Sequence, residues 1–275
     1  MTTSNDPVVS VDLVEASKKR AAYYAVDTHI QSGNLIGVGT GSTAKYLVDC
    51  LAERYNSGKL KDITCVPTSF QARHLIIDNG LPLSDLEQTP TLDICIDGAD
   101  EVDPDLNCIK GGGGCLTQEK VVMSCARRFM VVCDFRKRSK RLGMRFPRLP
   151  LEVVPAAYVP VKRYIETNEK GKCYLRLAES KAGPVITDNG NYVLDWDFPK
   201  EIEYNWKELN HRLKMVAGMV EAGLFIDVAE RAYFGMQNGS VCELVRKGVT
   251  KSADNQGNCQ LCDEWGGCTV VNGSA

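Results

Sequence analysis

Long apolar runs are absent from this 275-residue sequence, and so is the pattern of a secretory signal. A membrane-spanning helix needs about 20 consecutive apolar residues, and no stretch approaches that length. The first twenty residues lack a basic flank followed by an apolar core, which a signal peptide requires. The sequence therefore predicts a protein without a membrane partner, and the cytoplasm is its expected location.

Excess positive charge and paired histidines are lacking too. The formal net charge of −2 does not suggest the basic face of a nucleic-acid-binding protein, so no nucleic-acid partner is expected. The basic stretch 133–143 is interpreted as a solvated loop or a phosphate pocket. The histidines His29, His74 and His211 lie in separate expected helices, and none is spaced to share a metal ion with another.

Cysteine, by contrast, is abundant, with twelve residues in the chain. Most of them sit inside apolar runs such as DICID and VVCD, where reduced cysteine behaves as a small hydrophobic residue. Disulfide frameworks belong to small secreted domains, so we expect reduced structural thiols. Cys259, Cys262 and Cys268 form a C-x2-C-x5-C pattern, but a zinc site usually needs a fourth ligand, and none of the usual type follows.

The first half of the chain alternates between helical periods and short apolar strands. This alternation predicts a Rossmann-like parallel sheet that is flanked by helices on both faces, an α/β fold. The expected helices are 11–31, 44–54, 70–80 and 116–128, and the expected strands are 35–38, 63–67, 92–97 and 129–134.

The alternation of helical and strand patterns ends near residue 143, where a proline-rich stretch begins. Antiparallel strands are expected on either side of a loop, and the Asn189-Gly190 pair is a strong hairpin signal. Later strands are expected to return to the first sheet. The elements expected here are helices 161–166 and 205–216 and strands 172–179, 185–196, 223–235 and 240–245.

This change of pattern predicts that the chain is divided into three parts. Residues 1–142 together with 223–250 are expected to form an α/β catalytic domain. Residues 143–222 are expected to form an inserted smaller α+β domain. Residues 251–275 have no usable periodicity and are interpreted as a mobile tail.

The stretch GVGTGST, residues 37–43, lies between an expected strand and an expected helix. A helix N-terminus presents free N–H groups that suit a phosphate, and Thr40, Ser42 and Thr43 add hydroxyl donors. The stretch lacks the GK[ST] of a P-loop, and Ser42 occupies the third glycine position of a dinucleotide fingerprint. The alternative is a tight strand-to-helix turn that Ser42 caps.

The acidic segment DGADEVDPD begins where an expected buried strand ends. Ligands of open α/β sheets bind beyond the carboxyl ends of the strands, so Asp97 and Asp100 are placed to meet one. Glu101, Asp103 and Asp105 are expected to face solvent or to cap a turn. A calcium loop that starts at Asp103 fails, because its sixth position is a cysteine and its twelfth a glycine.

Lys110 is followed by four glycines and then by an expected helix that contains Glu119. The glycines could form a backbone nest for an anion, and Lys110 could stabilise a developing oxyanion. Taken alone, Glu119 is typical of a first-turn acid that complements the helix dipole. A catalytic carboxylate becomes attractive when Asp97, Lys110 and the glycines surround it.

The strings GVGTGST, DGADEVD, IKGGGGCLTQEK and VCD-x-RK, in this order and spacing, resemble the type A ribose-5-phosphate isomerases. The resemblance runs from about Ala16 to Val245 and includes TDNGNYVLDW and GLFIDVAERAYFG, the second of which is closer to eukaryotic members. The tail after about Lys247 lies outside it.

The resemblance implies an enzyme that interconverts ribose 5-phosphate and ribulose 5-phosphate in the non-oxidative pentose phosphate pathway. It implies no metal and no organic cofactor, and a homodimer or homotetramer. The implied catalytic residues are Glu119 as proton acceptor, with Asp97, Asp100 and Lys110. The implied substrate-binding residues are Thr40, Gly41, Ser42, Thr43, Asp97, Gly98, Ala99, Asp100, Lys110, Gly111, Gly112, Gly113 and Lys137.

The expected mechanism is removal of a proton by Glu119 to give a cis-enediolate, which Lys110 stabilises. The separate roles of Asp97 and Asp100 stay open at this point. Cys115 stands where many relatives carry alanine, which raises the possibility of thiol sensitivity. Two alternatives are another sugar-phosphate enzyme, such as an amino-sugar phosphate deaminase, and a non-catalytic sugar-phosphate sensor on the same fold.

Overall fold

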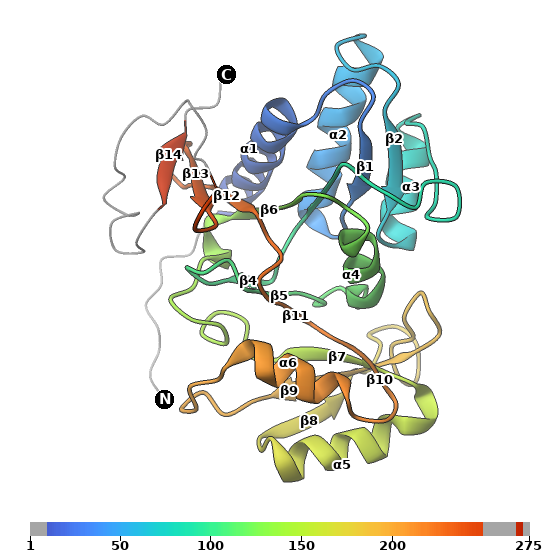
Figure 1. Ribbon diagram of the computed structural model, residues 1–275, viewed down its shortest axis with the longest axis vertical. Coiled ribbons are helices and arrows are strands. Elements are labelled where there is room, and N and C mark those ends of the chain that lie inside the picture. The colour runs from blue at the N-terminus through green and yellow to red at the C-terminus, as the bar shows by residue number, and fades with distance from the viewer. Residues whose placement is uncertain (1–9, 250–267, 272–275) are drawn as a thin grey trace.

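A computed structural model describes residues 10–249 and 268–271 of the chain. Its largest element is a seven-stranded sheet with the order β14-β13-β12-β6-β3-β1-β2 (Figure 1). Five neighbouring strands run parallel, as the sequence predicts. They are β1 (Leu35–Val38), β2 (Thr64–Pro67), β3 (Ile94–Asp97), β6 (Phe129–Asp134) and β12 (Arg231–Gly235).

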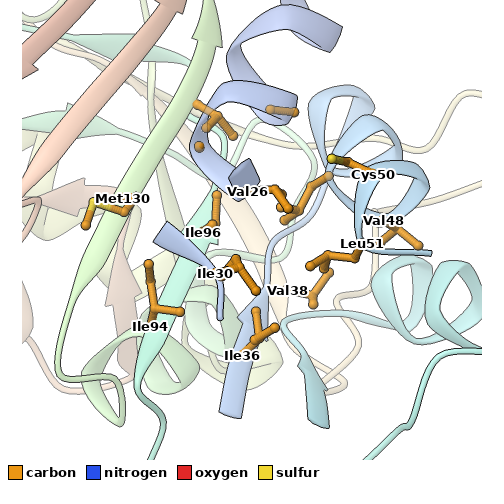
Figure 2. Packing of buried hydrophobic residues seen from close by; sticks show 14 of the residues in the cluster. Val26, Ile30, Ile36, Val38, Val48, Cys50, Leu51, Ile94, Ile96 and Met130 are labelled. Carbon is orange, nitrogen blue, oxygen red and sulfur yellow. The ribbon is translucent and has the colours of Figure 1, made fainter. Parts of the chain in front are cut away.

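Helices cover both faces of this sheet, because the central strands are buried on both sides and alternate their side chains between two cores. On one face, Ile94, Ile96 and Met130 pack with side chains of α1, α2 and α3, as Figure 2 shows in part. On the other face, Cys95 and Val131 pack with α4. These helices are α1 (Val11–His29), α2 (Ser42–Asn56), α3 (Phe70–Asp78) and α4 (Leu116–Ser124).

A second, antiparallel sheet has the order β10-β7-β9-β8 and lies at the other end of the molecule (Figure 1). Its core gathers around the fully buried Trp196. The sequence did not predict β7 or β10, because the prolines around β7 argue against a strand. The elements are β7 (Leu149–Val153), α5 (Tyr158–Asn168), β8 (Lys172–Leu175), β9 (Tyr192–Asp197), α6 (Trp206–Lys214) and β10 (Met219–Ala222). Since all of them fall within 149–222, we propose that residues 143–222 form an inserted unit.

Short strands link the two sheets, and they correct one expectation about the acidic segment. β4 (Glu101–Val102), β5 (Cys108–Ile109) and β11 (Leu224–Phe225) form a three-stranded sheet. Glu101 is fully buried and accepts hydrogen bonds from three successive N–H groups, those of residues 143–145. The expectation that Glu101 faces solvent or caps the turn at Pro104 is therefore wrong. Asp103 does organise that turn, through the N–H groups of Asp105 and Asn107.

The far edge of the main sheet holds two further differences from expectation. β13 (Val241–Val245) returns antiparallel to β12, and β14 (Thr269–Val271), which the sequence did not predict, pairs with β13. Cys242 and Cys268 form a disulfide there, so the expectation of reduced thiols is wrong for this pair. Eight other cysteines in the described residues are free, while Cys259 and Cys262, with most of the expected tail, lie outside those residues. In the described part of the chain, no helix is long and apolar enough to cross a membrane.

Candidate active site

The loop after β1 packs directly against the end of β3. A Cβ at Gly39 would lie 2.2 Å from Asp97 Oδ1, so only glycine allows this approach. The N–H of Thr40 donates to Asp97 Oδ1 at 2.9 Å. Gly41, with φ of +104°, precedes the first turn of α2, and no side chain caps the helix. Ser42 is exposed and is not the cap, which leaves the start of α2 open to a ligand.

Asp97, Lys110 and Glu119 form a buried charged cluster. Lys110 Nζ lies 3.0 Å from Asp97 Oδ2 and 3.4 Å from Glu119 Oε2, and each of these three residues is at least 95 % buried. Three elements bring them together: Asp97 ends β3, Lys110 follows β5, and Glu119 lies in the first turn of α4. Apart from these ion pairs with Lys110, Asp97 Oδ2 and Glu119 Oε2 make no hydrogen bond to the described residues.

The surroundings of the cluster shift the pKa values of Glu119 and Lys110. Burial raises the pKa of Glu119 above its ordinary value, and the attraction of Lys110 only partly offsets this effect. Burial lowers the pKa of Lys110, but Asp97 and Glu119 act in the opposite direction, and the net shift is upward. A lysine that stays charged beside a carboxylate with raised proton affinity suits proton transfer next to a developing anion.

Asp100 is held by the glycine segment, residues 111–114, rather than by Lys110. Its Oδ2 accepts the N–H of Gly112 at 2.7 Å, and a Cβ on Gly112 would come within 2.6 Å of Asp100 Oδ1. Gly111 adopts φ of +99°, a left-handed conformation that glycine tolerates. Gly98 is drawn into the same site, because its N–H donates to Asp97 Oδ1 and its carbonyl accepts Lys110 Nζ.

The remaining predicted residues lie around this centre. The Thr40 hydroxyl contacts the hydroxyls of Thr68 and Ser69, and Thr43 is buried in α2. Ala99 follows Gly98, and its carbonyl faces the Cys133 thiol. A Cβ added at Gly113 would meet no atom within 4 Å, so the surroundings of this glycine are open.

Lys137 lies on the short 3-10 helix Phe135–Lys137 that follows β6, the strand next to β3. Its side chain is half-buried. In the described residues its ammonium group has no hydrogen bond and no ion pair, unlike that of Lys110. It is therefore available to an anion at the same edge of the sheet, although no side-chain contact ties it to the buried cluster.

Contacts made by three residues from the region of the second sheet were missed from the sequence. Asp188 Oδ2 accepts a hydrogen bond from the N–H of Phe70 at the start of α3. Asn189 Oδ1 accepts a hydrogen bond from the side-chain amide of Gln118, the residue before Glu119. Arg176 reaches the carbonyls of the glycine segment. The Asn-Gly pair marked the turn, but nothing local in the sequence indicated which surface the turn would contact.

A cleft of about 380 Å³ opens beside the charged cluster without containing it. Its walls include Ser69 of the α3 start, Gln118 of α4 and Asp188 of the turn. Cys115 lies nearby at the start of α4, and burial raises the pKa of its thiol to about 12, which disfavours the reactive thiolate. Among residues 10–249 and 268–271, no three His, Cys, Asp or Glu side chains gather as a metal site would require.

Comparison with known proteins shows to which family this chain is similar. The family described as ribose 5-phosphate isomerase A (phosphoriboisomerase A) matches residues 64–239. A probable ribose 5-phosphate isomerase of Caenorhabditis elegans is 49% identical over 246 residues, which is 89% of this chain and 98% of the relative. The ribose-5-phosphate isomerase of Homo sapiens is 53% identical over 228 residues, 82% of this chain and 72% of the relative.

Solved structures give the same result. A D-ribose-5-phosphate isomerase in complex with phospho-erythronic acid superposes with a TM-score of 0.81 at 39% identity, covering 85% of this chain and 99% of the other. The ribose 5-phosphate isomerase of Plasmodium falciparum gives 0.80 at 36% identity, with coverage of 85% and 99%. The chain therefore belongs to the ribose 5-phosphate isomerase A family.

Proposed function

We propose that this protein interconverts D-ribose 5-phosphate and D-ribulose 5-phosphate through a cis-enediolate, as a step of the non-oxidative pentose phosphate pathway. The observation that carries the proposal is the buried cluster of Asp97, Lys110 and Glu119 at the carboxyl edge of the main sheet. Membership of the isomerase family supports the choice of substrate. A family relative solved with phospho-erythronic acid supports a sugar-phosphate ligand.

Glu119 is the proposed base. In the aldose-to-ketose direction it takes the proton from C2 of the open-chain sugar and returns it to C1. A second proton moves from the C2 hydroxyl to the C1 oxygen, so the carbonyl shifts by one carbon and no oxidant is needed. Two observations support this role: among the described residues, Lys110 at 3.4 Å is the partner of the buried Oε2, and burial raises the pKa of the carboxyl.

Lys110 is the proposed electrostatic group for the enediolate. Its ammonium is buried between two carboxylates, and a fixed charge in such a site stabilises a developing oxyanion more strongly than it would in water. Asp97 is fully engaged by Thr40, Gly98 and Lys110, so we assign it to orienting the lysine. Asp100, which is half-buried and accepts the N–H of Gly112, is better placed to exchange protons with the sugar hydroxyls and to open the ring.

Phosphate binding is assigned to Lys137 and to the open start of α2, residues 40–43. The N–H groups of Thr40 and Gly41 donate to Asp97 and Gln71, whereas those of Ser42 and Thr43 make no hydrogen bond within residues 10–249 and 268–271. Free N–H groups at a helix start, and a lysine with no partner in the same residues, both suit a phosphate. Holding the phosphate there would keep C1 and C2 within reach of Glu119. Lys137→Ala is expected to raise KM for ribose 5-phosphate while the fold, checked by circular dichroism, is retained. An unchanged KM would remove Lys137 from the phosphate site.

A turnover assay with ribose 5-phosphate tests the proposal as a whole. We expect ribulose 5-phosphate to form, and we expect the rate to persist after treatment with EDTA. Release of ammonia from an amino-sugar phosphate would support the deaminase alternative instead, and binding of ribose 5-phosphate without turnover would support the sensor alternative. The family match favours neither of them.

The assembly and the location are further parts of the proposal. We infer a homodimer or homotetramer that works in the cytoplasm, by analogy with the family. Sedimentation equilibrium of the full chain is expected to give a mass of two or four times 30.3 kDa. A single 30.3 kDa species at micromolar concentration would contradict it.

A further inference from the structure

We infer that Arg176 of the inserted unit is a positioning residue for the glycine segment of the active site. Its guanidinium Nη1 donates to the carbonyl of Gly111 at 3.0 Å and to the carbonyl of Gly112 at 2.9 Å. This inference rests on the proposed isomerase function. Arg176 was not among the residues predicted from the sequence, and it follows a strand of the second sheet.

Asp195 fixes the orientation of the Arg176 guanidinium. Its Nε donates to Asp195 Oδ2 at 2.8 Å, and its Nη2 donates to Asp195 Oδ1. Both side chains are about 85 % buried. A two-point arginine–carboxylate pair of this kind fixes the plane of the guanidinium. Arg176 directly follows β8 and Asp195 lies in β9, so the pair is built into the second sheet.

The bonds to the two carbonyls orient the peptide groups behind them. In a trans peptide the C=O and the N–H point in opposite directions. When Arg176 holds the carbonyl of Gly111, the N–H of Gly112 points the other way, and there it donates to Asp100 Oδ2 at 2.7 Å. When Arg176 holds the carbonyl of Gly112, the N–H of Gly113 is likewise turned away from the arginine.

The N–H of Gly113 makes no hydrogen bond to any residue between 10 and 249 or between 268 and 271. It is thus a donor left over for an oxygen atom of the substrate. A cation that is bonded to the carbonyl oxygen of a peptide group also polarises the N–H of the same peptide group. Arg176 would therefore fix the direction of this donor and strengthen it, although Arg176 touches no reacting atom itself.

The segment needs such support because glycine alone does not hold one conformation. Four consecutive glycines have the largest backbone freedom of any sequence. Gly111 is in a left-handed conformation, and its carbonyl is shared between Arg176 and the N–H of Gly114. Without the guanidinium, the peptide groups of residues 111–113 could rotate, and Asp100 would lose a fixed partner.

The test compares Arg176→Met with Arg212→Met. Arg212 makes the same two-point pair with Glu169 inside the inserted unit, but it does not touch the glycine segment. We expect Arg176→Met to lower kcat for ribose 5-phosphate by about 10- to 100-fold, the scale of a misplaced catalytic group, while KM changes much less. Arg212→Met is expected to retain the wild-type kcat. Equal kcat values for the two variants would overturn the inference.

Chemical rescue separates positioning from a merely structural role. Guanidinium ion added at millimolar concentration is expected to raise the kcat of Arg176→Ala and to leave that of Arg212→Ala unchanged. No rise with Arg176→Ala would overturn the inference. If the Arg176 variants do not fold, Asp195→Asn replaces them with Glu169→Gln as its control, and again only the first is expected to lose kcat.

A second readout keeps this inference separate from the proposed function. If the wild-type protein does not turn over ribose 5-phosphate, the proposed function fails, and affinity for phospho-erythronic acid decides the role of Arg176. Calorimetry is then expected to show weaker binding by Arg176→Met than by Arg212→Met. Equal affinities would overturn the inference in that case.

Discussion

At the scale of single residues, the proposed chemistry depends on the burial of Glu119 beside the Lys110 ammonium, which also pairs with Asp97. A first-turn acid usually faces water and only complements the helix dipole. Glu119 instead is 5% exposed and lies 3.4 Å from Lys110. This placement makes its carboxylate a stronger base than an exposed one, because burial disfavours the charged form.

Glu119→Gln is expected to lower kcat by at least about 100-fold, the usual contribution of a positioned base, while sugar-phosphate binding is retained. Because the pKa of Glu119 is raised in the folded state, its ionised form opposes folding at neutral pH, so the variant should be no less stable than the wild type. Steady-state kinetics and thermal unfolding measure the two effects.

Glu208→Gln is the matched control, since Glu208 is also a first-turn acid, in α6. It should keep the wild-type kcat and lose at most about 1 kcal/mol of stability through the helix dipole. Similar kinetics for both variants would mean that Glu119 has only the ordinary role of a first-turn acid.

The pH dependence of kcat/KM follows from the same shift. Glu119 must be deprotonated to accept a proton, and its pKa is raised by burial, so activity should fall on acidification well above the ordinary glutamate pKa of about 4.3. The apparent pKa reports Glu119 together with the charge of Lys110 beside it. A profile that stays flat down to about pH 4.5, in protein shown to be folded at each pH, would contradict the assignment.

The sequence predicted the three residues that form the buried cluster, because they stand in long, specific strings. It missed Arg176, and it misplaced Glu101. In both cases the deciding partners are far along the chain: Arg176 contacts residues 111 and 112, and Glu101 binds the N–H groups of residues 143–145. No periodicity or short motif carries information about such pairs.

At the scale of elements, a buried carboxylate organises the turn that reaches α3 and α4. Glu152 of β7 is fully buried, and its Oε1 accepts hydrogen bonds from the side chains of Thr187, Asn189 and Asn191. The turn it holds places Asp188 against the start of α3. A single acid thus connects the second sheet to the cleft beside the active site.

Glu152→Ala is expected to lower the free energy of unfolding by about 2 to 3 kcal/mol, because the buried Thr187 hydroxyl and two part-buried asparagine amides lose their acceptor. Glu166→Ala is the control, since Glu166 accepts one hydrogen bond, from the N–H of Cys173, and should cost about 1 kcal/mol. Urea unfolding measures both variants. Equal losses would show that the turn does not depend on Glu152.

The parallel strands and the long helices could be predicted because each has an apolar pattern of sufficient length. Strands of two residues, such as β4 and β5, are too short for a pattern. β7 was missed because of its prolines, and α4 ends at Ser124 rather than at the expected residue 128. These errors arise where tertiary pairing, rather than local preference, decides the structure.

At the scale of the whole molecule, the candidate active site combines residues around the main sheet with residues of the proposed inserted unit, 143–222. Asp97 ends β3 of the main sheet, Lys110 follows β5, and Glu119 lies in α4. The inserted unit adds Arg176 and the turn at Asp188. The far edge of the main sheet, with β13 and β14, lies on the other side of β12 and β6 from β1 and β2 (Figure 1).

Deletion of residues 251–275 should therefore spare catalysis and reduce stability. It removes β14 and the fully buried Val271, whose burial alone contributes about 1.5 to 3 kcal/mol. Thermal unfolding should show a lower Tm, while kcat for ribose 5-phosphate is retained. Cys268→Ala, which keeps the strand and removes the disulfide, separates the two contributions. A large loss of kcat on deletion would place the tail in the active assembly.

The central claim is that Glu119 moves one proton within ribose 5-phosphate. The most direct measurement is the isomerisation of ribose 5-phosphate in deuterium oxide, followed by proton NMR, with the wild type and Glu119→Gln side by side. We predict that the wild type forms ribulose 5-phosphate with deuterium at C1, and that the variant forms it at least about 100-fold more slowly. Undiminished isomerisation by Glu119→Gln, with the same deuterium content at C1, would contradict the claim.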